Sequence, residues 1–269
     1  MTIRRLGRSC LVATLVLVAG VGTLAQRSSF GGGGGGQFMG LGANVPYDGK
    51  FVFVRMSYNS GFGGRQGPMW SHDYPDGEAH FLKILTFVSN LPAHLDGSSV
   101  MAFDDPELFK FPVIYLVEPG TWSMNDAQVK ALREYLLKGG FLIVDDMGAG
   151  TYGLGGRYRP DQWPNFDSQM SRLFPAAHWF DLEADHPIFH AFFEIPAPHE
   201  IPQYYDGGKP IFRGLYEDND PAKRLMVFVN YNTDISEFWE FSEEGTKPVS
   251  ESNEAYKIGV NEFIYGITH

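Results

Sequence analysis

The stretch Gly139-Gly-Phe-Leu-Ile-Val-Asp-Asp-Met-Gly-Ala-Gly150 decides the fold. It opens with two glycines that stop a helix, continues as an apolar run from Phe141 to Val144, and then presents Asp145 and Asp146 before a glycine-rich turn. A short apolar run of this kind is typical of a buried parallel strand. Ligands of open α/β sheets bind outside the carboxyl ends of such strands. We therefore expect this strand to deliver side chains into a ligand-binding crevice.

The rest of the chain alternates between apolar runs and amphipathic segments. We expect strands at 51–56, 99–103, 111–117, 178–182, 211–216 and 225–229, and helices at 76–90, 126–138, 166–173 and 254–268. Strands that alternate with helices imply a parallel sheet with helices on both faces. We predict an α/β fold with a flavodoxin-like doubly wound sheet that can carry an antiparallel edge, in a single domain over residues 44–269.

Residues 1–25 have the features of a secretory signal peptide. Three arginines precede a short apolar run that ends at Val21, and Thr23-Leu24-Ala25 places small residues where a signal peptidase cleaves. An uncleaved inner-membrane anchor is the alternative, although the run is short for a membrane span. Residues 26–43 include six consecutive glycines and are predicted to form a flexible linker.

Charge and cysteine content exclude several classes of function. The formal net charge is −11 and becomes −14 once the three arginines of the leader are removed, so we expect no nucleic-acid partner, and membrane contact only through an uncleaved leader. Cys10 is the only cysteine and lies in that leader. A mature chain without cysteine has no disulfide, no zinc–thiolate site and no cysteine nucleophile. Such a chain suits a bacterial periplasm.

Several motifs, taken together, resemble a bacterial family. They are Trp70 with Tyr74-Pro75, Asp105-Pro-Glu-Leu-Phe109, Leu132-Arg-Glu-Tyr135 leading into Gly139–Asp146, Arg172-Leu-Phe-Pro175, Asp185-His-Pro-Ile188 and Tyr256-Lys-Ile-Gly-Val-Asn261. This set is similar to the domain-of-unknown-function family 4159, whose fold resembles that of class I glutamine amidotransferases. The resemblance places Asp146 at the elbow position of the amidotransferase nucleophile. It implies that scaffold but not glutaminase activity, which needs a thiolate.

Acidic residues follow several predicted strands, and we predict that they meet at one edge of the sheet. Asp145, Asp146, Asp105 and Glu118 are the candidate ligand-binding residues of this group. Their oxygen atoms can hold a divalent cation, which is the one cofactor that the sequence suggests, or can bind the hydroxyl groups of a saccharide. The alternative is structural, because acids at strand ends often cap the next helix. No dedicated metal motif is present.

A second group of candidate ligand-binding residues lies at and after the first strand. The loop before residue 76 carries Trp70, Asp73 and Tyr74, and aromatic residues in such a loop suit stacking on a sugar ring or contact with a protein. Arg55 lies near the end of the first strand. We expect it to form a buried ion pair with an acid.

Catalysis by Asp146 would need a base, and the sequence offers His186 or His72. His186 lies in Asp-His-Pro, a pattern that also indicates a structural turn.

Two hypotheses follow. The first is a non-catalytic module that binds a saccharide, a cell-envelope component or a protein. The alternative is a carboxylate-dependent hydrolase centred on Asp146, with His186 as its partner and with or without a cation. Asp146 in an open pocket beside a histidine would favour the hydrolase, and Asp146 buried against Arg55 or backbone amides would favour the module.

Overall fold

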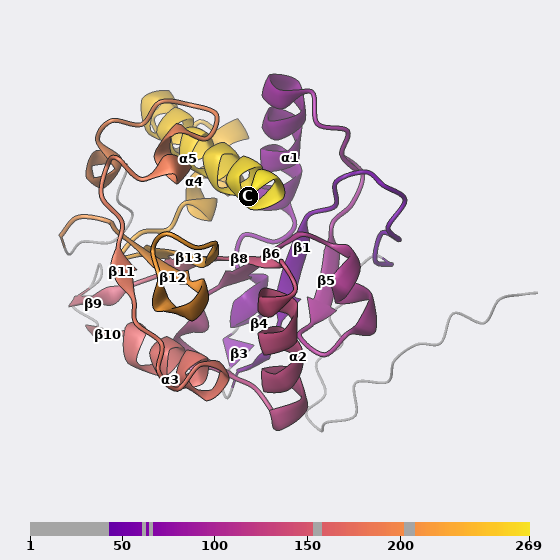
Figure 1. Cartoon of the computed structure of the whole chain (residues 1–269). Coiled ribbons are helices and arrows are strands. Elements are labelled where there is room, and N and C mark those ends of the chain that lie inside the picture. Colours follow the sequence, from indigo (N-terminus) through magenta and orange to yellow (C-terminus); the bar gives the residue numbers. More distant parts are fainter. Residues whose placement is uncertain (1–42, 61–62, 65–66, 153–157, 202–207) are drawn as a thin grey trace, which may run out of the picture. The chain divides into compact units, whose positions relative to one another are not determined.

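The computed structural model describes residues 43–60, 63–64, 67–152, 158–201 and 208–269 (Figure 1). The predicted signal peptide and nearly all of the predicted linker lie outside the described residues, so both stay predictions. Within the described part of the chain, no helix has the length and hydropathy needed to cross a membrane.

A seven-stranded sheet forms the centre of the fold. Its strands lie in the order β11 (Phe180–Asp181), β12 (Ile211–Tyr216), β13 (Leu225–Tyr231), β8 (Phe141–Met147), β6 (Val113–Val117), β1 (Val54–Ser57) and β5 (Ser99–Ala102). The five strands from β13 to β5 are parallel, β12 pairs antiparallel with β13, and β11 pairs antiparallel with β12. The predicted α/β fold is therefore confirmed, and the antiparallel edge that the sequence allowed is present.

Helices cover both faces of this sheet (Figure 1). Helices α1 (Asp76–Ser89), α4 (Ser236–Glu240) and α5 (Val249–Thr268) pack on one face, and α2 (Asp126–Leu137) and α3 (Trp163–Leu173) pack on the other. Three two-stranded pairs complete the strands: β2 (Asn59–Ser60) with β7 (Trp122–Ser123), β3 (Gly63–Gly64) with β4 (Gly67–Pro68), and β9 (Ala149–Tyr152) with β10 (Tyr158–Asp161). The short 3-10 helices are η1 (Met69–Ser71), η2 (Pro106–Lys110), η3 (Pro119–Thr121), η4 (Pro187–His190), η5 (Pro198–Glu200), η6 (Glu217–Asn219) and η7 (Phe241–Glu243).

The apolar runs alternate between two cores, one on each face of the sheet. In β6, Tyr115 packs toward α1, α4 and α5, whereas Ile114 and Leu116 pack toward α2 and α3. In β8, Ile143 packs toward α1, α4 and α5, and Val144 packs toward α2 and α3. Side chains that alternate along a strand point to opposite faces, so a central strand covered by helices on both faces must be apolar throughout.

The turn that leads into β8 depends on its two glycines. Helix α2 starts with a capping box in which the Asn125 side chain accepts from the Gln128 backbone and the Gln128 side chain accepts from the Asn125 backbone. Gly139 follows the helix with φ of 109°, a conformation that favours glycine. A Cβ atom at Gly140 would lie 2.2 Å from the ring of Tyr135. The prediction that the two glycines end this helix is confirmed.

Several element boundaries differ from the sequence prediction. Helix α5 begins at Val249 rather than at residue 254, helix α3 begins at Trp163 rather than at residue 166, and β13 continues two residues further than predicted, to Tyr231. Helix α1 begins at Asp76, as predicted, with Pro75 in the cap position. Helix α4 was not predicted, because its five residues are too few to show a period.

Candidate functional site at the carboxyl edge

Four non-glycine residues with a left-handed backbone lie where the loop before α1 and the ends of β6, β8 and β13 meet. They are Asp73, Glu118, Asp146 and Asn232, with φ of 58°, 49°, 52° and 60°. Non-glycine residues adopt this conformation rarely, and such strain concentrates at functional sites. The positive φ of Asp146 lies within β8, at the elbow position that the sequence indicated. This edge of the sheet is therefore the candidate functional site.

His72, Glu118 and Asp146 come together at this edge. The Nδ1 atom of His72 lies 3.3 Å from Oδ2 of Asp146 and 3.7 Å from Oε1 of Glu118. The imidazole side chain is 42% exposed, whereas the Asp146 side chain is 1% exposed. A buried carboxylate thus orients an accessible imidazole, which is the relation between acid and base in many hydrolytic sites.

The electrostatic environment raises the pKa of two of these groups. The hydrogen bond to Asp146 raises the pKa of His72 to about 9, against the opposing effect of burial. Burial, reinforced by the charge of Asp146, raises the pKa of Glu118 to about 8. Clustered groups with shifted pKa values are typical of functional sites.

A second acidic group shares Asp146. Carboxylate oxygens of Asp73, Asp146 and Asp234 lie within 4.8 Å of one another, and all three residues are buried. Ser236 Oγ donates to Asp73 Oδ2 at 2.6 Å, and the Glu237 amide donates to Asp234 Oδ1 at 3.0 Å. Burial and the neighbouring charge of Asp146 raise the pKa values of Asp73 and Asp234. Carboxylate oxygens of Asp73, Glu237 and Glu240 form a further group at the same spacing.

Asp145 is adjacent to Asp146, but its hydrogen bonds give it a structural role. Its carboxylate accepts from Tyr115 Oη at 2.6 Å, from the Ser236 amide at 3.0 Å and from the Ile235 amide at 3.1 Å. Burial raises its pKa to about 6, against the lowering effect of these donors. Asp145 therefore ties β8 to β6 and to the start of α4.

Arg55 holds the loop that carries His72. The expected buried ion pair is confirmed, and its partner is Glu78 on α1, which the sequence analysis did not identify. Both side chains are 1% exposed. Nη1 of Arg55 also donates to the carbonyl oxygens of Trp70 at 3.1 Å and His72 at 2.8 Å. Arg55 thus fixes the backbone at Trp70 and His72, and with it the position of the His72 imidazole.

The two aromatic candidates of the loop have different surroundings. Trp70 is 7% exposed and packs in the core beneath α2 and α3, so its ring is a core side chain and not an open platform for stacking. Tyr74 is half-buried, with its ring centroid 6.0 Å from Cζ of Arg55.

Two predicted residues lie away from this edge. The Asp105 carboxylate caps η2 by accepting from the Glu107 amide at 2.9 Å, which is the structural alternative considered for strand-end acids. His186 accepts from the Ile188 amide at 3.2 Å and packs against Tyr265 and against Tyr216, which ends β12 beside the start of β13. The expected pairing of Asp146 with His186 is wrong, because the Asp-His-Pro turn belongs to the opposite edge. His72, and not His186, is the histidine that contacts Asp146.

The partly buried His186 gives a prediction for stability in acid. Burial lowers its pKa to about 4 from the ordinary 6.5, so between these values the unfolded chain binds a proton that the folded chain does not. The contribution of His186 to the stability of the wild type should therefore become unfavourable as the pH falls from 6.5 to 4. His186→Asn, which keeps an acceptor for the Ile188 amide, should lose less stability than the wild type over this range. Urea unfolding of both proteins at pH 7, 5.5 and 4 checks this, and parallel curves would contradict it.

Other contributors to the site carry no sequence signal. Gln162 Nε2 donates to Glu118 Oε2 at 2.6 Å, and Ser236 bonds Asp73. Both residues are far from their partners in the chain and belong to no motif. Only the topology that brings β8, β6 and β13 side by side brings them together.

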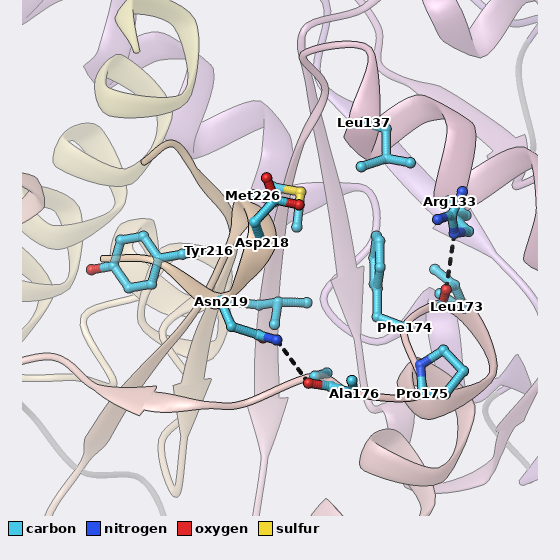
Figure 2. Close-up of a pocket in the computed structure, with 12 residues that line it drawn as sticks. Arg133, Leu137, Leu173, Phe174, Pro175, Ala176, Tyr216, Asp218, Asn219 and Met226 are labelled. Carbon is cyan, nitrogen blue, oxygen red and sulfur yellow. Dashed lines mark hydrogen bonds between the residues drawn. The ribbon is translucent and has the colours of Figure 1, made fainter. Parts of the chain in front are cut away.

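A separate pocket lies at the opposite end of the parallel strands (Figure 2). Its volume is about 260 Å³, and its walls come mainly from the ends of α2 and α3 and from β12 and β13. Two polar side chains of the pocket form hydrogen bonds to backbone carbonyl groups, drawn as dashed lines in Figure 2. Arg133 donates to the Leu173 carbonyl at 3.1 Å, and Asn219 donates to the Ala176 carbonyl at 2.8 Å. This pocket is largely apolar, so the polar chemistry lies at the carboxyl edge.

Comparison with known proteins places the chain in a family without assigning it an activity. No curated protein matches the sequence. The model of the family described as Domain of unknown function (DUF4159) matches residues 52–267, which include every strand-end residue of the carboxyl edge. The resemblance seen in the sequence motifs is thus confirmed, and the chain belongs to the DUF4159 family.

Proposed function

We propose that this protein is an exported hydrolase whose reacting groups are His72, Glu118 and Asp146. The observation that carries the proposal is the position of the His72 Nδ1 atom, 3.3 Å from Asp146 and 3.7 Å from Glu118, on an imidazole that is open to solvent. Hydrolysis needs two titrating groups within reach of one substrate atom. His72 and Glu118 meet this requirement, and Asp146 orients the imidazole.

The scaffold supports a site at this edge. The parallel strands follow the order β5-β1-β6-β8-β13, which is the 2-1-3-4-5 order of flavodoxin-like sheets, with the reversal between β1 and β6. Glu118 follows β6, and Arg55 of β1 fixes the His72 loop. We extend the proposal to an amidotransferase-like scaffold in which Asp146 stands at the elbow where those enzymes carry cysteine. The positive φ of Asp146 supports this assignment.

Export is part of the proposal and rests on the leader. The arginines, apolar run and small residues of 1–25 support cleavage after Ala25. We expect the protein from the periplasmic fraction of an expressing bacterium to begin at Gln26 when its N-terminus is sequenced. An intact leader in the membrane fraction would instead indicate an anchored protein.

The substrate class that we favour is a neutral saccharide or ester of the cell envelope, because the clustered acids disfavour an anionic substrate. The test is a panel of chromogenic glycosides, esters and phosphates, assayed with wild type, His72→Gln, Glu118→Gln and Asp146→Asn. We expect turnover of a glycoside or ester. Turnover should fall about 100-fold or more in His72→Gln, since general acid–base groups contribute 10²–10⁴-fold.

A matched control is available on the surface. His94 Nε2 lies 2.9 Å from Asp48 Oδ1, a histidine–aspartate pair outside the edge, and His94→Gln should keep full turnover. Absence of turnover across the panel, or full turnover in His72→Gln, would contradict the proposal.

The second candidate is the non-catalytic binding module. It is favoured by the burial of Asp146, whose 1% exposure differs from the open pocket expected of a nucleophile. A ligand that raises the melting temperature of wild type but is not consumed would support this function.

A further inference from the structure

The donor atoms of His72, Glu118 and Asp146 have the spacing of ligands around one metal ion. Nδ1 of His72 is 3.3 Å from Oδ2 of Asp146 and 3.7 Å from Oε1 of Glu118, and the three donor atoms lie within 4.8 Å of one another. Ligands held about 2.1 Å from an ion are separated by about 3.0 Å in octahedral and about 3.4 Å in tetrahedral geometry. Small side-chain rotations would therefore complete the coordination.

The donor types point to a particular class of ion. An all-oxygen set suits Ca²⁺ or Mg²⁺, whereas imidazole combined with carboxylates suits Mn²⁺, Fe²⁺ or Zn²⁺. The imidazole also distinguishes this group from an ordinary cluster of acids, because its Nδ1 atom lies within 3.7 Å of an oxygen of each carboxylate.

The charge of the surroundings also favours a cation. Asp146 is shared with buried Asp73 and Asp234, so carboxylates crowd one region. The nearby Arg55 is engaged by Glu78, and Lys247 pairs with Glu237 at 2.9 Å. Like charges removed from water repel strongly unless a counter-charge lies among them.

Solvent reaches the three donors mainly at His72. The His72 side chain is 42% exposed, whereas those of Glu118 and Asp146 are 8% and 1% exposed. A catalytic metal keeps a coordination position open for water or substrate, and an ion held beside a partly exposed imidazole meets this requirement.

We propose that His72, Glu118 and Asp146 bind one divalent transition-metal ion, Mn²⁺ or Zn²⁺, which activates the hydrolytic water. This inference deepens the proposed function and takes its site from it: with the ion bound, the three side chains act as its ligands, and the metal-bound water replaces His72 as the group that gives up a proton. The metal supplies a bound water of lowered pKa. Glu118 and Asp146 supply the negative charge that holds the ion, and Arg55 holds the loop that presents His72.

The test is isothermal titration of the EDTA-treated mature protein, residues 26–269, with MnCl₂ and with ZnCl₂. We expect one equivalent to bind, and binding in His72→Gln to weaken about 100-fold or more, because even outer partners of metal ligands contribute about 10- to 100-fold. His94→Gln should bind as wild type does. Since His72 is partly exposed, His72→Gln should fold normally, and a single cooperative melting transition in EDTA verifies this.

Each outcome decides the matter. Absence of metal binding overturns the metal proposal. Equal binding by wild type and His72→Gln also overturns it, because the ion would then lie among Asp73, Asp146 and Asp234 and not at His72. Turnover that persists in EDTA also overturns it and leaves the proposed function intact. Metal binding that depends on His72, without hydrolysis of any panel substrate, supports the metal site and refutes the hydrolase.

Discussion

Replacing Arg55 with Met should destabilise the fold by about 3–5 kcal/mol, the cost of leaving one member of a buried ion pair uncompensated. Glu78 would keep its charge at 1% exposure without a counter-ion. The carbonyl oxygens of Trp70 and His72 would also lose their donor. The free energy of unfolding, measured by urea denaturation with circular dichroism, gives the effect.

The double variant Arg55→Met/Glu78→Met separates the ion pair from the loop contacts. It should recover much of the loss, because an apolar pair of similar volume often replaces a buried ion pair without cost. The surface pair of Lys83 with Glu243, 2.8 Å apart and with both side chains more than half exposed, is the control. Lys83→Met should change stability by less than about 1 kcal/mol. Equal effects of Arg55→Met and Lys83→Met would contradict this account of Arg55.

The second large effect is expected at Asp145. Asp145→Asn should destabilise the fold by about 2–3 kcal/mol. The buried backbone amides of Ile235 and Ser236 donate to the Asp145 carboxylate, and an Asn side chain offers them one oxygen acceptor in place of two. Tyr115→Phe, which removes one donor and leaves the carboxylate in place, should cost less, about 1 kcal/mol. Urea unfolding of the two variants checks the order. A larger loss in Tyr115→Phe would contradict it.

Much of the fold was predictable because its signals are local. The β8 segment shows its apolar run and its flanking glycines within twelve residues, and the Asn125 cap lies next to its helix. The sequence left an antiparallel edge open but did not assign strands to it. Helix α4 was not predicted because it is short and is held by residues distant in the chain, among them Asp145, which accepts from the Ser236 amide, and Phe81, which stacks on Trp239.

The candidate site was predictable only in part. Asp146, Glu118 and Asp73 were selected because they follow strands or lie in a long loop. The choice between His72 and His186 could not be made from the sequence, since both lie far from Asp146 in the chain. It depends on the Arg55 contacts that place the His72 loop over the edge. Likewise, Trp70 looked like a ligand-stacking residue because composition does not show which side of a loop faces the core.

The central claim is that Asp146, unlike its neighbour Asp145, is held at the edge for function and contributes little to stability. Burial, reinforced by the charge of Asp146, raises the pKa values of Asp73, Glu118, Asp145 and Asp234, whereas the partly exposed His72 is a favourable partner of Asp146. Asn also tolerates the left-handed backbone at this position.

The most direct test is the free energy of unfolding of Asp146→Asn beside Asp145→Asn, in EDTA at pH 7. We predict unequal losses: Asp146→Asn should cost much less than Asp145→Asn, because the loss of the hydrogen bond to His72 is offset by relief of the repulsion between Asp146 and its acidic neighbours. If Asp146→Asn destabilises the fold as much as Asp145→Asn does, Asp146 is a structural residue and the functional assignment of this edge is wrong.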